Sequence, residues 1–311
     1  NSQSQISNLK SDIQTHEAVP IAIVGMDACF GQWTDLRKFQ ERVLGGDKGA
    51  TPTFKRDWWG AENSDLADGG IAGHYLDDLR IPIDRFRIPP KELEETLPQQ
   101  LLMLQVAAGA LKDAACANLD GLKTGAFIGI ELDMETNHFH FRWSLLNRAR
   151  AWAKAPNLDF SEKEFERWVD ALRESSGPAL NANRTMGALG GIVASRLARE
   201  FRIGGPSHTI SCEEASGMRA LEAAVRALQQ GELDHALVGA VDLSGDVRAA
   251  LAVDSGRAYS RNGEARPFSR DTEGAIPGEG AAALVLKRLD DAIKDGNRVY
   301  SVIRGTGAAS G

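Results

Sequence analysis

The chain has 311 residues, enough to bury a large core in one or two lobes, and 42% of them are hydrophobic. Its formal charge is −7, from 36 basic and 43 acidic side chains, and this acidic balance argues against an extended nucleic-acid groove. Three cysteines without framework spacing predict a reduced, cytoplasmic protein, and no apolar run reaches the roughly 18 residues that a membrane span needs.

Apolar runs beside glycine or charged turns predict strands, and longer amphipathic stretches predict helices. Residues 1–19 are polar, rich in Ser, Gln and Asn, and are interpreted as a linker. The expected strands are 20–25, 125–130, 207–211, 235–242 and 281–288. The expected helices are 34–44, 97–115, 186–200 and 214–230. Strands that alternate with helices predict an α/β sheet covered on both faces.

An unusually long connection separates strands 125–130 and 207–211. Its segment 139–175 is rich in Arg, Trp and Glu, which predicts a helical excursion or a dimer-contact region. On a strand, His138 and His140 could place two imidazoles on one side, but no cysteine or third histidine lies nearby, so we predict no metal site. The alternating carboxylates just before them are interpreted as a solvated strand end: Glu131, Asp133 and Glu135.

The most informative segment is 206–221, which reads Pro-Ser-His-Thr-Ile-Ser-Cys-Glu-Glu-Ala-Ser-Gly-Met-Arg-Ala-Leu. A strand, a tight turn and a helix are expected here, an arrangement that presents one residue at a helix N-terminus, where an anion is favoured. The segment resembles the nucleophile elbow of β-ketoacyl synthases, roughly G-P-S-x-T-x-D-T-A-C-S-S-S-L-x-A-L, whose Cys carries the acyl chain. Aligned from Gly205 without a gap, Glu214 takes the place of that Cys, and Cys212 lies two positions earlier.

The flanking sequence supports this register. The family continues with a helix, a short acidic turn and a buried strand, which match 220–228, 231–234 and 236–242 here. Placing Cys212 at the nucleophile position would delete two residues inside the elbow and break one flank. We therefore assign the position to Glu214 and keep Cys212 as the alternative nucleophile.

Four further segments resemble the family in the expected order. They are Pro20–Met26 (P-I-A-I-V-G-M), Gly73–Asp78 (G-x-F-L-D-D), Leu97–Leu104 (D-P-Q-Q-R-L-L-L, without its Asp and Arg) and Pro277–Leu286 (G-E-G-A-G-x-x-V-L). With the elbow, they identify the chain as similar to ketosynthases, most of all to the chain-length-factor domains of polyunsaturated fatty acid synthases and iterative polyketide synthases. This resemblance implies a thiolase-like, layered α-β-α fold.

That fold is a duplicated lobe, and the resemblance implies that residues 20–298 form the N-terminal lobe and 299–311 start the C-terminal one. In the family, two catalytic histidines lie in the second lobe, and none of the six histidines here sits in either motif. We therefore expect the remainder of the C-terminal lobe to be absent from this chain and to be supplied by another piece of polypeptide.

The resemblance also implies partners. A carboxylate at the nucleophile position attacks thioesters poorly, and the mixed anhydride that it would form lies uphill of the thioester. We therefore expect a non-condensing, chain-length-factor-like domain without a bound cofactor. It would form a dimer with an active ketosynthase, which receives substrates on the phosphopantetheine arm of an acyl carrier protein.

Two other functions stay open. An active β-ketoacyl synthase would use Cys212 for decarboxylative Claisen condensation, and a decarboxylating priming domain would use Glu214 in its protonated form. Met186 and Met218 could line an acyl channel, because methionine adapts to irregular apolar space; ordinary core packing is the simpler explanation.

Overall fold

The structure is a computed structural model. It describes residues 19–45, 52–55, 70–76, 78–115, 120–130, 136–154, 159–243, 247–256, 258–266, 269–271 and 274–309. Apart from Val19, the predicted linker lies outside these residues. The same is true of the three carboxylates predicted to end a strand, Glu131, Asp133 and Glu135.

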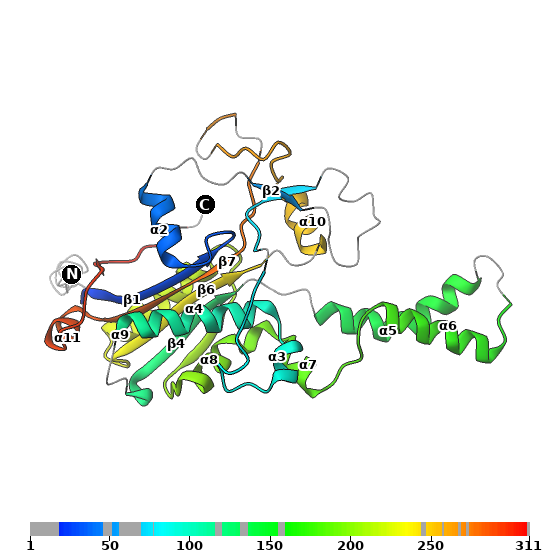
Figure 1. The fold of residues 1–311 in the computed structure, drawn as a ribbon, viewed down its shortest axis with the longest axis horizontal. Coiled ribbons are helices and arrows are strands. Elements are labelled where there is room, and N and C mark those ends of the chain that lie inside the picture. Colours follow the sequence, from blue (N-terminus) through cyan, green and yellow to red (C-terminus); the bar gives the residue numbers. More distant parts are fainter. Residues whose placement is uncertain are drawn as a thin grey trace, which may run out of the picture.

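A six-stranded mixed sheet forms the centre of the molecule, in the order β5-β4-β6-β7-β1-β8 (Figure 1). Its strands are β1 (Ile21–Phe30), β4 (Thr124–Ile130), β5 (Ser207–Ile210), β6 (His235–Asp242), β7 (Gly280–Arg288) and β8 (Ser301–Ile303). β4 runs parallel to β5 and β6, whereas β7 runs antiparallel to β6 and β1. β1 is longer than predicted because its pairing with β7 continues to Phe30 opposite Gly280.

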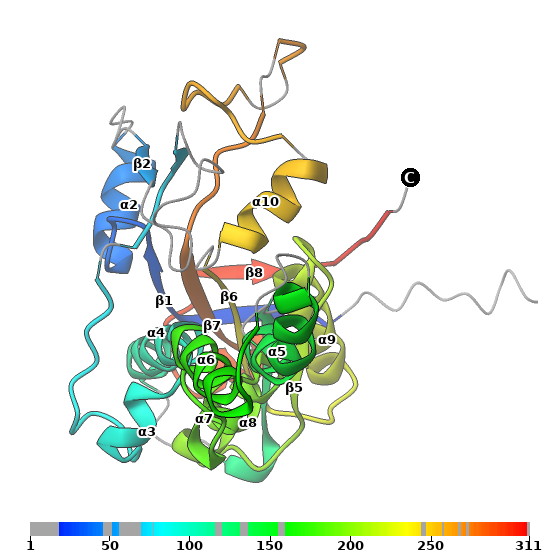
Figure 2. The same ribbon diagram turned by 90° about the vertical axis from the view of Figure 1, so that its right-hand side faces the viewer.

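Helices cover both faces of this sheet, which confirms the predicted α/β layers (Figure 2). Helices α4 (Pro98–Ala114) and α8 (Val193–Phe201) bury the face that includes Ile128. Helix α9 (Ser216–Gln229) packs on the opposite face, against Phe127 and Val238. Successive strand residues point to opposite faces, so Phe127 and Ile128 belong to different core clusters.

The predicted single helix over 186–200 is wrong. The segment divides into α7 (Ala182–Gly187), the 3₁₀ turn η3 (Gly190–Ile192) and α8. Gly187 sits against another chain segment, since a methyl group there would lie 1.9 Å from the Glu95 carbonyl oxygen. This close backbone approach, followed by two consecutive glycines, separates the two helices.

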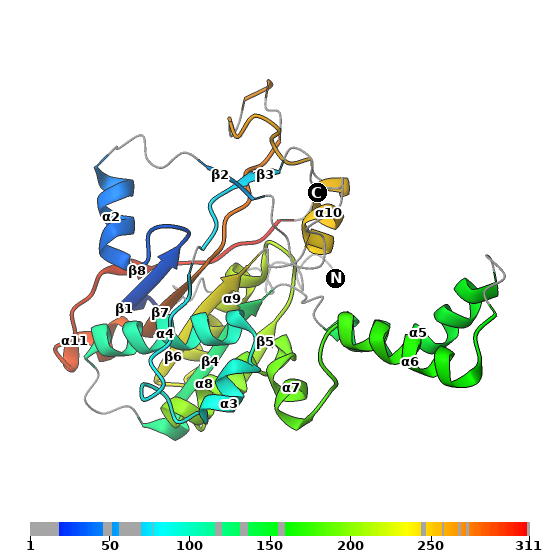
Figure 3. The same cartoon turned by 45° about the vertical axis from the view of Figure 1, so that its right-hand side comes forward.

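The segment 139–175 forms a helical excursion, as predicted. Helices α5 (Thr136–Lys154) and α6 (Glu162–Ser175) pair with each other and project from the lobe as an arm (Figure 3). Leu145 and Ala149 of α5 are buried, as is Val169 of α6. Because α5 already begins at Thr136, the paired histidines of the sequence lie on a helix and not on a strand.

Several shorter elements complete the lobe. The two-stranded sheet β2–β3 and helix α10 form a small cap, whose core combines Ile71, Tyr75, Ala250 and Tyr259. The segment expected to open a second lobe contributes β8, which pairs with β1. The remaining bounds are α2 (Leu36–Leu44), β2 (Thr53–Lys55), β3 (Ile71–Gly73), α3 (Pro90–Glu94), η2 (Gly121–Lys123), α10 (Val247–Gly256) and α11 (Leu289–Lys294).

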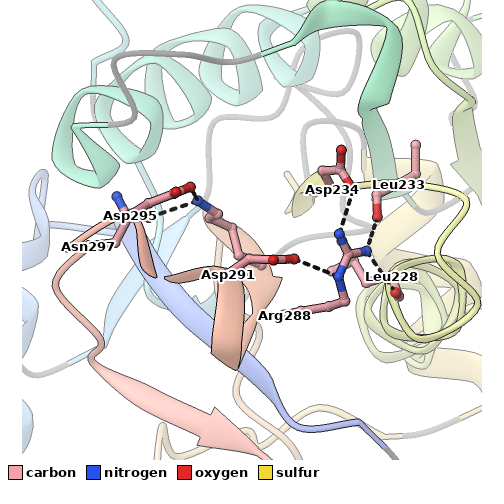
Figure 4. A network of polar contacts seen from close by, with 8 residues as sticks. Leu228, Leu233, Asp234, Arg288, Asp291, Asp295 and Asn297 are labelled. Atoms are coloured by element: carbon pink, nitrogen blue, oxygen red, sulfur yellow. Dashed lines mark hydrogen bonds and ion pairs between the residues drawn. The ribbon is translucent and has the colours of Figure 1, made fainter. Parts of the chain in front are cut away.

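A polar network fixes the end of β7 to its neighbours (Figure 4). The Arg288 guanidinium donates to Asp234 at 2.5 Å, to Asp291 at 2.6 Å and to the Leu233 carbonyl at 2.5 Å. Lys287, which is 2% exposed, pairs with Asp295 and donates to Asn297. These bonds attach both α11 and the turn before β6 to the sheet.

Candidate functional site

The elbow lies between β5 and α9, which pack side by side against β4. β5 ends at Ile210 and α9 begins at Ser216, two residues later than predicted, with Ala215 as its N-cap. The turn between them is formed by 211–215, and each of its residues is exposed. In the part of the chain that the structure describes, the turn of the elbow is therefore accessible to solvent.

Local hydrogen bonds hold the turn in one shape. The Ala215 and Ser216 amides donate to the carbonyls of Cys212 and Glu213, each at 3.0 Å. The buried Ser216 hydroxyl accepts from the Cys212 amide at 2.8 Å and donates to the Glu213 carbonyl at 2.5 Å. Glu213 has a φ of +47°, a left-handed conformation that side chains other than glycine rarely adopt. The chain therefore reverses sharply immediately before Glu214.

Two glycines allow the elbow to pack closely against the sheet. A methyl group at Gly129 of β4 would lie 2.6 Å from the Gly217 nitrogen, closer than real side chains approach. A methyl group at Gly217 would lie 2.9 Å from the Ala240 Cβ on β6. The first turn of α9 is thus fixed directly over the carboxyl ends of β4 and β6.

Charged side chains follow the elbow on the first turns of α9. Arg219 donates to Glu222 at 2.7 Å, and Arg226 also pairs with Glu222, at 2.5 Å. The hydrogen bond from Arg219 lowers the pKa of Glu222. The pKa of Arg219 is raised, first by Glu222 and to a smaller extent by the Cys212 thiol, so the guanidinium lies within reach of that sulfur.

The structure places the other predicted site residues apart. Met218 is 65% exposed on the first turn of α9. Met186 is 50% exposed on α7 and lines a cavity of about 340 Å³ with Arg87, Arg196 and other residues of α3 and α8. The helix α8 beside Met186 packs on one face of the sheet and α9 on the other, and Met218 is not among the described residues that line this cavity. A shared acyl channel stays a prediction.

A buried polar network that sequence reasoning missed supports the segment before the elbow. Gln100 is 1% exposed and donates to the carbonyls of Gly187 at 2.8 Å and Leu189 at 3.0 Å. Its side-chain oxygen accepts from Arg196 at 2.7 Å, and Arg196 pairs with Glu92 at 2.8 Å. Gln100 belongs to one of the family-like segments, but its sequence position does not reveal these partners.

Among the described residues, no group of three or more His, Cys, Asp or Glu side chains could hold a metal ion. The helices described here also include none that is both long and apolar enough to cross a bilayer.

Comparison with known proteins identifies the family. Residues 18–292 match the sequence profile described as "Beta-ketoacyl synthase, N-terminal domain". The chain belongs to the β-ketoacyl synthase family. This β-ketoacyl synthase domain is 30% identical over 291 residues to a polyunsaturated fatty acid synthase polypeptide of Thraustochytrium sp. and 27% identical over 303 residues to polyketide synthase PksM of Bacillus subtilis. These matches cover 91% and 96% of the chain, but 13% and 6% of the relatives.

Solved structures share its fold. The PfaC keto synthase-chain length factor superposes with a TM-score of 0.73 at 24% identity, covering 88% of this chain and 29% of that one. The ketosynthase from module 6 of the bacillaene synthase of Bacillus subtilis gives 0.68 at 25% identity, covering 91% and 42%. The thiolase-like ketosynthase fold expected for this β-ketoacyl synthase domain is confirmed, and the domain spans a small part of its curated relatives.

Proposed function

We propose that this domain is a non-condensing, chain-length-factor-like ketosynthase domain. The observation that carries the proposal is Glu214, which the ungapped alignment assigns to the nucleophile position and which lies exposed in the elbow. Condensation needs a nucleophile that takes an acyl group from a carrier thioester and later releases it to a carbanion. Acyl transfer to the Glu214 carboxylate would release the carrier thiol and leave a mixed anhydride, which lies uphill of the thioester. Glu214 is therefore unsuited to store an acyl chain.

Pairing with an active ketosynthase gives such a domain its role. β5, the strand that leads into the elbow, lies at the edge of the sheet, and its outer backbone groups can pair with a strand of a neighbouring domain. The open elbow at its end would then face the partner. In this arrangement the partner performs the condensation on chains held by the phosphopantetheine arm of an acyl carrier protein, and this domain helps to shape the pocket that limits chain length.

Acyl transfer tests the proposal in the full-length protein. Acyl-loaded and malonyl-loaded carrier proteins are added, and mass spectrometry of the peptide spanning 207–219 reports any acyl adduct. We expect no adduct and no condensation product with the parent protein. Glu214→Cys should introduce an adduct at position 214, since this change places a thiol near the helix N-terminus. Cys212→Ser serves as the matched control and should behave as the parent does. An adduct on Cys212 in the parent would contradict the proposal.

One observation favours a second function, an active condensing enzyme that uses Cys212. The Arg219 guanidinium lies beside this thiol, and reactive cysteines commonly have a cationic neighbour of this kind. For this function, Cys212→Ser abolishes acyl loading and Arg219→Gln slows it, whereas Glu214→Gln leaves loading unchanged.

A further inference from the structure

A second cavity lies on the helical arm, and none of its lining residues belongs to the elbow. Its volume is about 600 Å³, and it lies between the start of α5, the end of α6 and the segment that follows. Pockets of this size hold small molecules in many proteins. The lining residues are His140, Arg142, Trp143, Arg173 and Leu180.

Among the lining residues that the structure describes, the polar side chains are cationic or basic. Arg142 is fixed in place because its Nη1 donates to the carbonyls of Arg173 and, at 2.7 Å, of Gly177. Those bonds use one nitrogen, and the guanidinium carries further N–H groups on Nε and Nη2. Arg173 forms an ion pair with Asp170 at 3.3 Å, and the Asp170 side chain is 68% exposed. Exposed ion pairs of this kind contribute little free energy, so Asp170 competes only weakly for the Arg173 guanidinium. The lining residues that the structure describes therefore carry two guanidinium groups and no carboxylate.

Helix α5, which carries part of the cavity lining, is itself basic. Its residues 136–154 include four Arg or Lys side chains and no Asp or Glu. The rest of the chain is acidic overall, so the basic character is local to this helix. An anion entering the cavity would meet no carboxylate from the helix that carries three of the five lining residues.

The two remaining lining side chains of the cavity are apolar and exposed to solvent. Trp143 is 77% exposed and Leu180 is 53% exposed, although both are large hydrophobic side chains. Covering them with an apolar chain would remove their surface from water, which is favourable in proportion to the area. The cavity thus offers cations and an apolar surface side by side.

We propose that this cavity binds an anion, a carboxylate or a phosphate, that is carried on an apolar chain. The guanidinium groups of Arg142 and Arg173 recognise the anion through charge-assisted hydrogen bonds, and Trp143 and Leu180 contact the chain. The site is separate from the elbow. The inference goes beyond the proposed function and does not depend on the inactivity of Glu214.

Calorimetry of the full chain with three eight-carbon probes tests the site. Octanoate and monooctyl phosphate share the apolar chain with 1-octanol but carry a charge. We expect both anions to bind at least about tenfold more tightly than the alcohol. The ratio between the two anions then shows whether the site prefers a fatty-acid carboxylate or a phosphate. Equal affinity for 1-octanol would overturn the proposal, because the cations would then have no role.

Variants locate the binding on the arm. Arg173→Gln removes one cation and should weaken octanoate binding about tenfold, and Trp143→Ala should weaken octanoate and 1-octanol together. Arg167→Gln, on the same helix but outside the cavity, is the matched control and should bind as the parent does. If both lining variants bind as the parent does, the probes occupy another place and the proposal fails.

Discussion

Glu213 has a backbone conformation that its side chain does not favour. Its φ of +47° is typical of glycine, and a residue with a Cβ in this conformation costs on the order of 1 kcal/mol. The Ser216 hydroxyl compensates by bonding to both the Cys212 amide and the Glu213 carbonyl. The elbow is thus a strained turn held by one buried hydroxyl.

Replacing this residue tests the strain. Glu213→Gly should raise the free energy of unfolding by up to about 1 kcal/mol, because glycine adopts the left-handed region without a Cβ clash. Denaturant unfolding of the full chain measures the change. Glu213→Ala is the control: it removes the carboxylate but keeps the Cβ, so no comparable gain is expected. A larger gain for Ala than for Gly would show that charge, and not backbone strain, limits stability here.

At the scale of single residues, the sequence predicted where the elbow lies but not the shape of its turn. The ungapped alignment predicted a strand, a turn and a helix here, and β5 and α9 confirm these elements, whereas the assignment of Glu214 to the nucleophile position stays a prediction. The left-handed turn at Glu213 could not be foreseen, since a glutamate gives no signal for it. The influence of Cys212 on Arg219 was missed for a similar reason: it depends on the shape of the turn that brings the two residues within reach.

Helix α9 approaches the sheet closely because glycine lies on both sides of the contact. Gly129 on β4 faces the backbone of Ser216 and Gly217, and the ideal Cβ position at Gly129 lies 2.6 Å from two of their atoms. The atoms that it would meet belong to the backbone, so a side-chain rotation cannot relieve the overlap. The position of the elbow over β4 therefore depends on this residue.

Gly129→Ala should destabilise the fold by about 1–3 kcal/mol, the usual cost of overpacking a filled contact. It should also shift the elbow away from the sheet. Chemical denaturation gives the energy, and the rate at which iodoacetamide labels Cys212 reports the displacement. Gly191→Ala is the matched control, since a methyl group there meets no atom within 4 Å. Equal stabilities of the two variants would contradict the close contact.

The prediction of elements succeeded where the local pattern determines the structure. β4, β6 and β7 are continuous apolar runs buried between helices, and their predicted bounds agree with the structure within a residue. The helix predicted over 186–200 was wrong because the packing of Gly187 on a distant carbonyl is not visible in the local sequence. The short strands β2 and β3 were missed, since they have three residues each and depend on the cap core around Tyr75 and Tyr259.

The stability of the whole lobe should depend on pH through one buried and one half-buried histidine. His235, at the start of β6, is 7% exposed, and burial followed by the charge of Lys287 lowers its pKa below the ordinary value of 6.5. Its Nδ1 atom is buried without a hydrogen-bond partner in the structure. Burial, followed by the charge of Arg42, also lowers the pKa of His74. Both imidazoles are therefore held neutral in the folded chain.

These two histidines should accordingly make the folded chain less stable as the pH falls. The unfolded chain binds a proton on each histidine near pH 6.5, whereas the folded chain resists protonation until lower pH, so stability is lost as pH falls below 6.5. Thermal unfolding between pH 7.5 and 5.5 measures the slope. His235→Leu should flatten it, because this variant removes the imidazole at the buried start of β6. A slope unaffected by His235→Leu would assign the effect to other groups.

The position of β1 in the sheet sets an order of events during synthesis. Among the strands of this domain, β1 is synthesised first, yet its two neighbours are β7 and β8, whose residues begin at Gly280 and Ser301. At about 5–20 residues per second, β1 waits on the order of ten seconds or longer before either neighbour exists. Helix α4 packs against β1 and is made much earlier, so it can shield one face but not the two edges. A nascent chain stalled before Gly280 would expose an apolar strand with both edges free, a substrate for chaperones or aggregation.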